Sequence, residues 1–402
     1  MRLPYLKGGP QFIRSLNWRL VISLLRRNGK MSRTDLVHAV GVKPSTITSI
    51  IQELIKEGLV VEVGVGPSTT VGRRPILLSL NHNYGQTLGA YVQSRCVVTG
   101  YLTLDGRLSK TSEAKYRPGS SPKTVLTALK KAASCLPAPS RLLGVGISVA
   151  GFVQSANNGV IYSPSMDWHE VDLSALFRQT FDAPVYLAND VNALAVGERW
   201  YGAGRHFQNF ICVSVGEGIG AGIYLDSSLY EGANGGAGEV GHTCVQLYGP
   251  QCRCGEYGCL ETLSSDSFLA REAKRHDLPA DPEDLIERAL AGDTTARDIF
   301  KQMGTHLGVG IKNLVNLFNP EAIIVGGDRI NALGLFGEAM EEMLLKHSFS
   351  RISEHLKILP AKLGKAGWVI GAGTLPLRAR FSPSVLTRTS LTNVYNEDRM
   401  RY

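Results

Sequence analysis

Three cysteines fall within eight residues of this chain, in the stretch Cys252-x-Cys254-Gly-x-x-Gly-Cys259, and His242 stands ten residues before the first of them. Three thiols and one imidazole make a complete set of soft ligands for tetrahedral zinc, and four protein ligands make such an ion structural rather than catalytic. Disulfides and a chance cluster of free thiols are the alternatives, but Cys252 and Cys254 are too close to pair without strain. We expect one structural Zn²⁺ per chain.

The whole-chain properties are those of a multi-domain cytoplasmic protein. With 402 residues the chain is too long for one typical domain, so two or three are expected. No apolar run reaches membrane-spanning length, and the N-terminus lacks the apolar region of a signal peptide. The other four cysteines are scattered, as is usual for buried thiols in a reducing compartment. We expect no membrane insertion.

Positive charge is concentrated at the N-terminus. Residues 1–80 hold 12 Lys and Arg against 4 Asp and Glu, whereas the rest of the chain holds 31 of each. A small basic module ahead of a neutral body favours nucleic-acid binding by that module. A solvated basic face is the alternative, and the pattern inside the segment decides between them.

Two helices joined by a glycine turn follow a longer first helix in this basic segment. Apolar residues predict helices over 12–28 and about 44–57, and Ser32 with Asp35 resembles a capping box that starts a helix between them. Gly41 supplies the turn, and short strands over 59–63 and 76–80 follow. This pattern predicts a winged helix-turn-helix.

Hydroxyl side chains at the start of the second helix suit a recognition helix in the major groove, and two arginines at the tip of the wing suit a narrow minor groove. Simple helix capping is the alternative reading of the hydroxyls, and a protein-docking role is the alternative for the module. The residues predicted to contact double-stranded DNA are Lys43, Ser45, Thr46, Thr48, Ser49, Gln52, Arg73 and Arg74.

From residue 82 onward, short apolar runs alternate with helical stretches and glycines, which predicts an α/β body. One long helix is expected over 305–318. The predicted strands are 88–92, 97–104, 142–149, 185–188, 210–215 and 322–325.

Two loops at strand ends are candidate binding sites. Asn189 and Asp190 end one strand, where α/β sheets place ligands, although a turn or helix cap is as common there. The Gly216-Glu217-Gly218 loop ends another. Such a loop can cradle phosphate, but Glu217 would repel it and a tight hairpin is a serious alternative.

Gly238-Glu239-Val240-Gly241-His242 followed by the cysteine loop and Glu261 resembles the ROK family of repressors and sugar kinases, and the resemblance covers nearly the whole chain. It implies an actin/hexokinase-like (ribonuclease H-like) body with two α/β lobes around a sugar cleft. The family's metal ligands fall on His242, Cys252, Cys254 and Cys259. Its sugar contacts fall on Asn189, Asp190, Glu239, His242 and Glu261.

The winged module places the chain with the Mlc, NagC and XylR type of regulator within that family. We expect this module over 1–81, and a small α/β lobe over 82–192 to which the resemblance returns residues 375–402. A large α/β lobe with the zinc loop and the dimer interface is expected over 193–374.

Several departures separate the chain from the ROK kinases. The kinases carry an Asp-x-Gly-x-Thr phosphate loop where this chain has Leu88-Gly89-Ala90-Tyr91-Val92, and their Gly-Thr-Gly is Gly216-Glu217-Gly218 here. Mg-ATP binding is therefore not expected, and Asp190, the general base in the kinases, would only bind sugar. Ser165 stands where the family usually has a sugar-binding asparagine, which leaves the sugar preference open.

These observations predict a sugar-responsive, non-enzymatic transcriptional regulator, most simply a repressor of carbohydrate genes. It would bind an inverted-repeat operator as a homodimer or homotetramer and leave it when a sugar or sugar phosphate binds. The alternatives are a bifunctional sugar kinase, and a regulator with a vestigial cleft that is controlled by a protein partner.

Overall fold

The computed structural model describes residues 9–66, 74–154, 160–178, 180–349 and 352–382. The chain divides into two compact units: the first lies within residues 1–147, 173–186 and 373–402, and the second within 148–172 and 187–372. The three-domain division with boundaries near 82, 193 and 375 remains a prediction. Within the described chain, every helix is either too short or too polar to span a bilayer.

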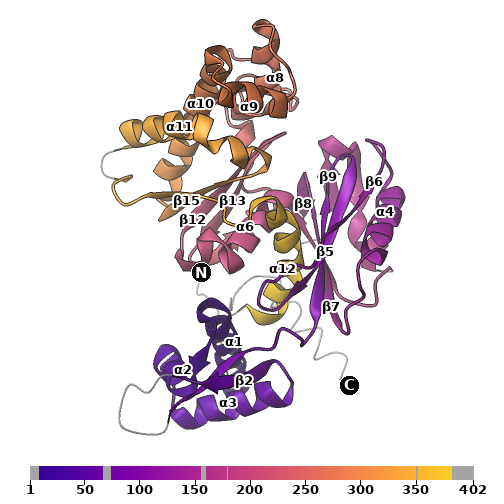
Figure 1. Ribbon diagram of the computed structural model, residues 1–402, viewed down its shortest axis with the longest axis vertical. Helices are drawn as coiled ribbons and strands as arrows, with labels where there is room; N and C mark the ends of the chain where they lie inside the picture. The colour runs from indigo at the N-terminus through magenta and orange to yellow at the C-terminus, as the bar shows by residue number, and fades with distance from the viewer. Residues whose placement is uncertain (1–8, 67–73, 155–159, 179, 350–351, 383–402) are drawn as a thin grey trace, which may run out of the picture. The chain divides into compact units, whose positions relative to one another are not determined.

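The N-terminal part of the first unit contains three helices and a small antiparallel sheet of order β1-β3-β2 (Figure 1). Its elements are α1 (Pro10–Asn28), β1 (Met31–Ser32), α2 (Arg33–Val40), α3 (Pro44–Lys56), β2 (Val60–Val65) and β3 (Ile76–Leu80). The expected helix-turn-helix and both wing strands are present, and the short strand β1 is an addition to the prediction.

Local signals explain where these helices begin and end. Ser32 and Asp35 form the expected capping box, since each side chain accepts a bond from the other residue's backbone N–H. Gly41 ends α2 with φ +73°, a left-handed conformation that glycine adopts without cost. Pro44 occupies the first turn of α3, which buries one apolar face consisting of Ile47, Ile50, Ile51 and Leu54.

The remainder of the first unit is built on a five-stranded sheet of order β11-β7-β4-β5-β6. Its strands β7 and β11 continue into the second unit at their carboxyl ends. Strands β4 and β5 pair antiparallel in unbroken register from Gln86 opposite Thr103 to Val92 opposite Val97. The elements of this part are β4 (Gln86–Val92), β5 (Cys96–Thr103), β6 (Ser112–Lys115), α4 (Pro122–Ser134), β7 (Leu142–Val149), α5 (Leu173–Arg178) and β11 (Val185–Asn189).

The second unit contains a five-stranded mixed sheet of order β14-β13-β12-β15-β16 (Figure 1). Strand β12 pairs antiparallel with β13 and parallel with β15, and β15 pairs parallel with β16. The strands are β12 (Phe210–Val215), β13 (Ile219–Leu225), β14 (Ser228–Tyr230), β15 (Ala322–Gly326) and β16 (Lys357–Pro360). A separate three-stranded sheet consists of β8 (Phe152–Gln154), β9 (Val160–Ser163) and β10 (Trp168–Asp172).

Helices of the second unit bury their apolar faces against this mixed sheet and against each other, in a core that includes Phe300, Leu307 and Phe336. The helices are α6 (Asp190–Tyr201), α7 (Leu260–Ser264), α8 (Asp266–Arg275), α9 (Pro282–Leu290), α10 (Thr294–Phe318) and α11 (Leu333–His347). Helix α12 (Gly367–Phe381) begins in this unit and ends in the first. Short 3₁₀ turns are η2 (Pro164–Met166), η3 (Ala203–His206), η4 (Val240–His242), η5 (Asp328–Ala332) and η6 (Gly364–Ala366).

The long helix α10 corrects one expectation. It begins at Thr294 rather than at Thr305, because Asp293 caps it by accepting a bond from the backbone N–H of Ala296 at 3.0 Å. The buried Ala296, Ile299, Phe300 and Met303 already follow the helical period before Thr305, so the sequence contained the signal for the earlier start.

Candidate functional site

The four residues of the predicted metal site converge in the second unit. The ligand atoms of His242, Cys252, Cys254 and Cys259 all lie within 4.8 Å of one another. His242 Nδ1 is 3.5 Å from Cys252 Sγ, and Cys254 Sγ is 3.7 Å from Cys259 Sγ. His242 closes the turn η4, whereas Cys259 directly precedes α7. This cluster can hold a metal ion.

Backbone hydrogen bonds fold the loop that carries the cysteines. The N–H of Cys252 donates to the carbonyl of Glu256 at 2.7 Å, and the N–H of Gly255 donates to the carbonyl of Cys252 at 3.0 Å. Gly258 has φ +69°, and a Cβ there would lie 1.7 Å from the carbonyl oxygen of Gln246. The loop therefore requires glycine at 258, for conformation and for space.

The thiols have different surroundings. The backbone N–H of Glu256 lowers the pKa of the exposed Cys254 thiol, whereas burial raises the pKa of Cys252 and Cys259. A bound cation would favour all three as thiolates, the form in which cysteine binds metals. Three sulfurs and one nitrogen, with no carboxylate among the four, match a soft or borderline metal ion.

Asn189 and Asp190 stand where β11 passes into α6. The Asn189 side chain caps α6 by accepting from the N–H of Asn192 at 3.0 Å, and its Nδ2 donates to the Gly151 carbonyl at 3.0 Å. The helix-cap reading of Asn189 is thus present in the structure. Two of the four hydrogen bonds that an asparagine amide can make are left for other partners.

The carboxylate of Asp190 lies in an environment that disfavours its charge. Its pKa is raised to about 6, chiefly by burial and also by the nearby carboxylates of Glu239 and Asp328, while the backbone N–H of Val191 opposes this rise by donating to Oδ1 at 2.9 Å. A strand-end carboxylate with such a perturbed pKa is a functional-site candidate. Asp328 follows Gly326 and Gly327 at the end of β15, a strand that the sequence predicted over 322–325 without any role for the aspartate.

Glu239 precedes His242 in the chain, and Glu261 follows Cys259. Loss of hydration raises the pKa of the Glu239 carboxylate, although the residue as a whole is exposed; His242 and Arg253 lower this pKa and Glu261 raises it. Asp190 in turn senses Glu239. The five predicted sugar-binding residues therefore belong to one unit, and electrostatic interactions connect four of them, Asp190, Glu239, His242 and Glu261.

Glu261 is buried and has a partner that the sequence analysis missed. Its Oε1 lies 2.8 Å from Arg253 Nε, and its Oε2 lies 3.1 Å from Arg253 Nη2. The backbone N–H of Ile219 also donates to Oε2, at 3.3 Å. The only sequence signal for this contact was the position of Arg253 between Cys252 and Cys254. That signal was weak, because any residue type can stand between two cysteines.

The Gly216-Glu217-Gly218 loop is a tight hairpin between β12 and β13, with Val215 paired opposite Ile219. The N–H of Gly216 donates to the carbonyl of Gly218 at 3.2 Å, while the N–H of Ile219 is engaged by Glu261. These two N–H groups already have protein acceptors, and the exposed Glu217 adds negative charge. The hairpin alternative thus describes this loop better than a phosphate cradle.

The predicted DNA-contacting residues of α3 differ in exposure. Lys43, Ser45, Thr48 and Gln52 are exposed, whereas Thr46 and Ser49 are half-buried. The Thr48 hydroxyl donates to the Pro44 carbonyl at 2.9 Å, and Ser49 Oγ accepts from Arg14 Nη2 of α1 at 3.4 Å. A complex with DNA would have to share or break these two bonds.

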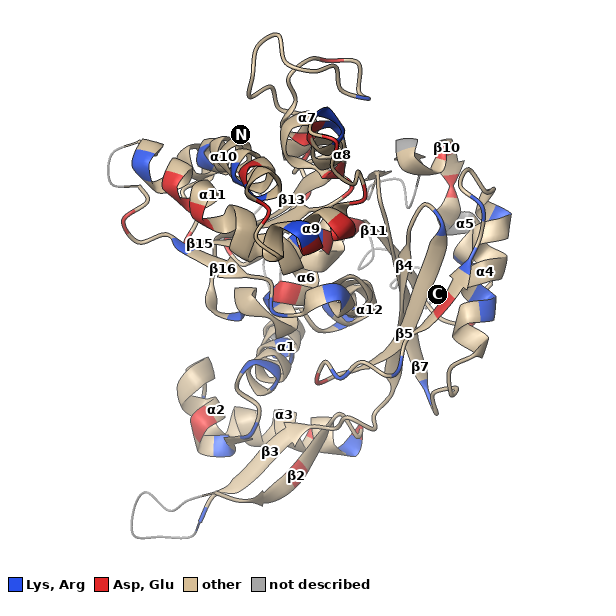
Figure 2. Ribbon diagram, turned by 45° about the horizontal axis from the view of Figure 1, so that its top comes forward, with Lys and Arg blue, Asp and Glu red and all other residues tan. Residues whose placement is uncertain are grey.

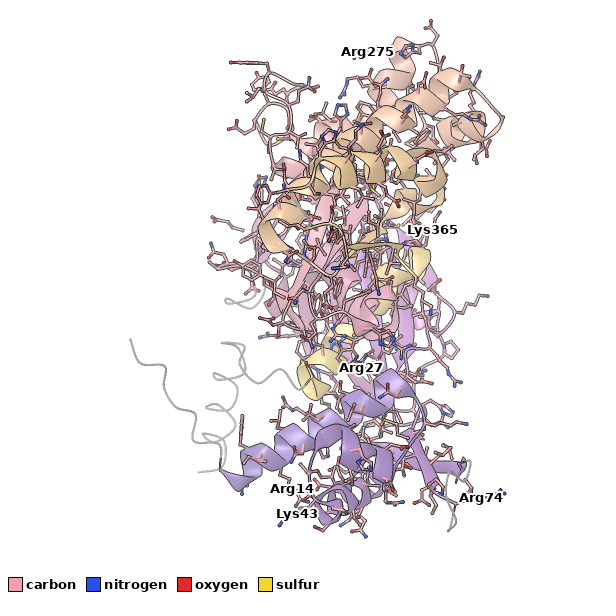
Figure 3. All side chains as sticks on the ribbon, turned by 90° about the vertical axis from the view of Figure 1, so that its left-hand side faces the viewer. Arg14, Arg27, Lys43, Arg74, Arg275 and Lys365 are labelled. Carbon is pink, nitrogen blue, oxygen red and sulfur yellow. The ribbon has the colours of Figure 1, made fainter. Side chains whose placement is uncertain are left out.

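Basic residues are distributed over the N-terminal helices and the start of the wing strand β3. Lys and Arg recur on α1, α2 and α3 in Figure 2, and Figure 3 shows Arg14, Lys43 and Arg74 on this part of the chain. Arg74 is exposed just before β3, and the predicted Arg73 lies outside the described residues.

Comparison with known proteins gives the same two parts. A model of winged helix-turn-helix DNA-binding domains matches residues 19–61, and a model of the ROK family matches residues 100–379. The xylose repressor of Caldicellulosiruptor bescii is 32% identical over 383 residues, which cover 90% of this chain and 96% of that protein.

Solved structures agree. A ROK family transcriptional regulator described as a homologue of the E. coli MLC protein has a TM-score of 0.77 at 27% identity, covering 92% of this chain and 97% of that chain. A ROK family glucokinase from Streptomyces griseus, solved in complex with glucose and AMPPNP, has a TM-score of 0.65 at 28% identity, covering 72% of this chain and 98% of that chain. The expected fold class, a winged helix-turn-helix followed by an actin/hexokinase-like body, is confirmed, and the chain belongs to the ROK family.

Proposed function

We propose that this protein is a transcriptional regulator that binds an operator through its winged helix-turn-helix and responds to a monosaccharide bound in its ROK body. The observation that carries the proposal is the presence of both parts in one chain that aligns along nearly its whole length with a protein named xylose repressor. Repression of carbohydrate uptake or metabolism genes, relieved by the sugar, is the favoured outcome. The protein would act in the cytoplasm.

The proposed sugar contacts are Asn189, Asp190, Glu239, His242 and Glu261. A sugar presents neighbouring hydroxyls that donate and accept hydrogen bonds. Carboxylates accept from such hydroxyls, and an amide can both donate to them and accept from them. Glu239 raises the pKa of Asp190, and Glu261 raises the pKa of Glu239, which supports this grouping because charges act on one another only at short range.

The proposed cofactor is one structural Zn²⁺ held by His242, Cys252, Cys254 and Cys259. Zinc fits a ligand set of three thiolates and an imidazole, and a full set of four protein ligands gives it no catalytic role. Its chemistry here is to crosslink the cysteine loop to η4, which places Glu239 and Glu261 near each other.

We infer that the protein is not a sugar kinase. The stretch Leu88–Val92 lacks the aspartate and the threonine of the kinase phosphate loop, and the N–H groups of Gly216 and Ile219 already donate to the Gly218 carbonyl and to Glu261. Catalysis of phosphoryl transfer depends on positioning and neutralising the phosphates, which Glu217 and Asp328 would oppose. The similarity to a glucokinase keeps the kinase as the second candidate.

The proposed DNA contacts are the α3 residues and wing arginines named above. Two modules in a homodimer or homotetramer would read an inverted repeat, with half-sites about one helical turn apart.

A binding experiment tests the proposal. The full-length protein selects duplexes from a random library, and fluorescence anisotropy then follows the selected duplex during titration with D-xylose, D-glucose and N-acetyl-D-glucosamine. We expect one sugar to lower DNA affinity at least tenfold, and Asp190→Ala to remove that response while DNA binding persists. Failure to enrich any duplex would exclude the DNA-binding role.

The same preparation separates the alternatives. Sugar-dependent ATP hydrolysis would establish the kinase reading. Control by a protein partner would be indicated if the protein binds its operator normally, no sugar changes that affinity, and Asp190→Ala leaves it intact.

A further inference from the structure

The arginine between two metal ligands is bonded to the carboxylate proposed to bind sugar. Arg253 separates Cys252 from Cys254, and its guanidinium makes two parallel bonds to Glu261, at 2.8 Å from Nε to Oε1 and 3.1 Å from Nη2 to Oε2. A bidentate arginine–carboxylate pair fixes orientation as well as distance, because the planar guanidinium matches the planar carboxylate.

The pair leaves Glu261 with little remaining capacity. An ionised carboxylate can accept about four hydrogen bonds. Arg253 uses one position on each oxygen, and the N–H of Ile219 uses the second position on Oε2. The position left for a ligand hydroxyl is therefore on Oε1, and its direction is set by the two protein partners.

The hairpin before β13 provides the space for this pair. A Cβ at Gly218 would lie 2.8 Å from Glu261 Oε2 and 3.2 Å from Arg253 Nη2. Gly218 has no positive φ, so glycine is required there for space rather than for backbone conformation. Gly218 thus permits the Arg253–Glu261 contact.

The burial of the two partners is unequal. The side chain of Glu261 is 7% exposed, whereas that of Arg253 is 48% exposed. Removal of the arginine would leave a buried carboxylate without its counter-charge and with Glu239 nearby. Arg253 reaches Glu261 from the solvent side, and the backbone N–H groups of Cys252 and Gly255 hold the loop around it by donating to the carbonyls of Glu256 and Cys252.

We propose that Arg253 is a positioning residue of the sugar site, which orients Glu261 toward one ligand hydroxyl and makes sugar affinity depend on the metal loop. This role rests on the proposed function. Loss of the ion would free the segment from Cys252 to Cys254, so that Arg253 no longer holds Glu261. Sugar and metal then stabilise each other's binding through this one side chain.

Calorimetric titration of the full-length protein with D-xylose and with D-glucose tests this role. Arg253→Met removes both bonds, and we expect about 10- to 100-fold weaker sugar binding, the range for a lost hydrogen bond to a charged group. Arg253→Lys restores part of the affinity, because an ammonium provides one charged donor. Metal content, measured on the same samples, stays at about one ion per chain.

A double-mutant cycle distinguishes positioning from simple structural support. In the Glu261→Gln background, Arg253→Met has little further effect on sugar affinity, because its partner is already altered. Gly218→Ala lowers sugar affinity by displacing the same pair. Arg275→Met is the matched control, since Arg275 is an exposed arginine of α8 paired with Glu272, and it leaves sugar binding unchanged.

Three results would overturn the role of Arg253. One is wild-type affinity in Arg253→Met. Another is an equal loss in the Glu261→Gln background, which would mean that Arg253 contacts the sugar itself. The third is metal loss in Arg253→Lys together with reduced affinity. Absence of sugar binding by the unaltered protein would instead remove the proposed function, and this role with it.

Discussion

Asp190, a proposed sugar contact, lowers the stability of the folded protein at neutral pH. Its carboxylate is surrounded by protein atoms and lies near two other carboxylates, and its pKa is raised to about 6. The unfolded chain releases this proton near pH 4. The folded protein therefore becomes less stable as the pH rises from about 4 to about 6, and the penalty is complete above that range.

Asp190→Asn should consequently stabilise the sugar-free protein at pH 7.5 but not at pH 4. The amide keeps the size of the side chain and can still accept the bond from the N–H of Val191. A shift of about two pKa units corresponds to roughly 2–3 kcal/mol at most. Urea unfolding at both pH values measures it, and a stabilisation of equal size at both would contradict the assigned cause.

The His242 and cysteine cluster was predictable at the level of single residues, whereas its neighbours were not. Residue type and spacing are enough to single out Cys252, Cys254 and Cys259, because few side chains bind soft metals. Arg253 and Asp328 belong to the commonest surface residue types. Their roles depend on the side chains that they contact in the folded protein, and the neighbouring sequence does not indicate those contacts.

At the scale of elements, the cysteine loop depends on two glycines with different requirements. Both have positive φ, +98° at Gly255 and +69° at Gly258. No heavy atom of the described chain lies within 4 Å of a Cβ placed at Gly255, whereas one at Gly258 would overlap the carbonyl of Gln246. A neighbouring segment therefore excludes a side chain at Gly258 but not at Gly255.

Gly258→Ala should therefore abolish metal binding, and Gly255→Ala should preserve it at a stability cost of about 1–2 kcal/mol for the left-handed backbone. Metal per chain, determined by elemental analysis after purification, provides the comparison. Retention of the ion in Gly258→Ala would show that the loop can rearrange around a side chain, contrary to this account.

Elements with strong local signals were predicted well. The strands over 142–149 and 210–215 have the predicted bounds, and the capping box at Ser32 begins α2 as expected. Helix α6 was not predicted as a helix, although its capping residue Asn189 was noted. Its many buried small residues give no amphipathic period, because the helix is covered on nearly every side.

At the scale of the whole molecule, the net charge differs between the N-terminal module and the rest of the chain. The excess of basic residues lies in the first 80 positions, ahead of a body with equal numbers of acidic and basic residues. Binding to a polyanion releases condensed counterions, so operator affinity should fall steeply as salt rises.

Lys43→Ala should lower the slope of log affinity against log salt by about one, because an exposed residue at the start of α3 would lose one phosphate contact. Arg275→Ala, in α8, should leave the slope unchanged. Anisotropy titrations between about 50 and 200 mM KCl measure both. An unchanged slope for Lys43→Ala would mean that α3 does not approach the phosphates as proposed.

The sequence by itself identified the cluster of His242 and three cysteines, the helix-turn-helix and the basic module, since each depends on residue types at short spacing. Only the tertiary structure decided that Glu261 is held by Arg253 and the Ile219 N–H, and that Asp190 senses Glu239 and Asp328. These groups are separated by up to 138 positions in the chain. Their meeting depends on how the sheet and its loops pack, and a charge is tuned by whatever lies within a few ångströms of it, regardless of its place in the chain.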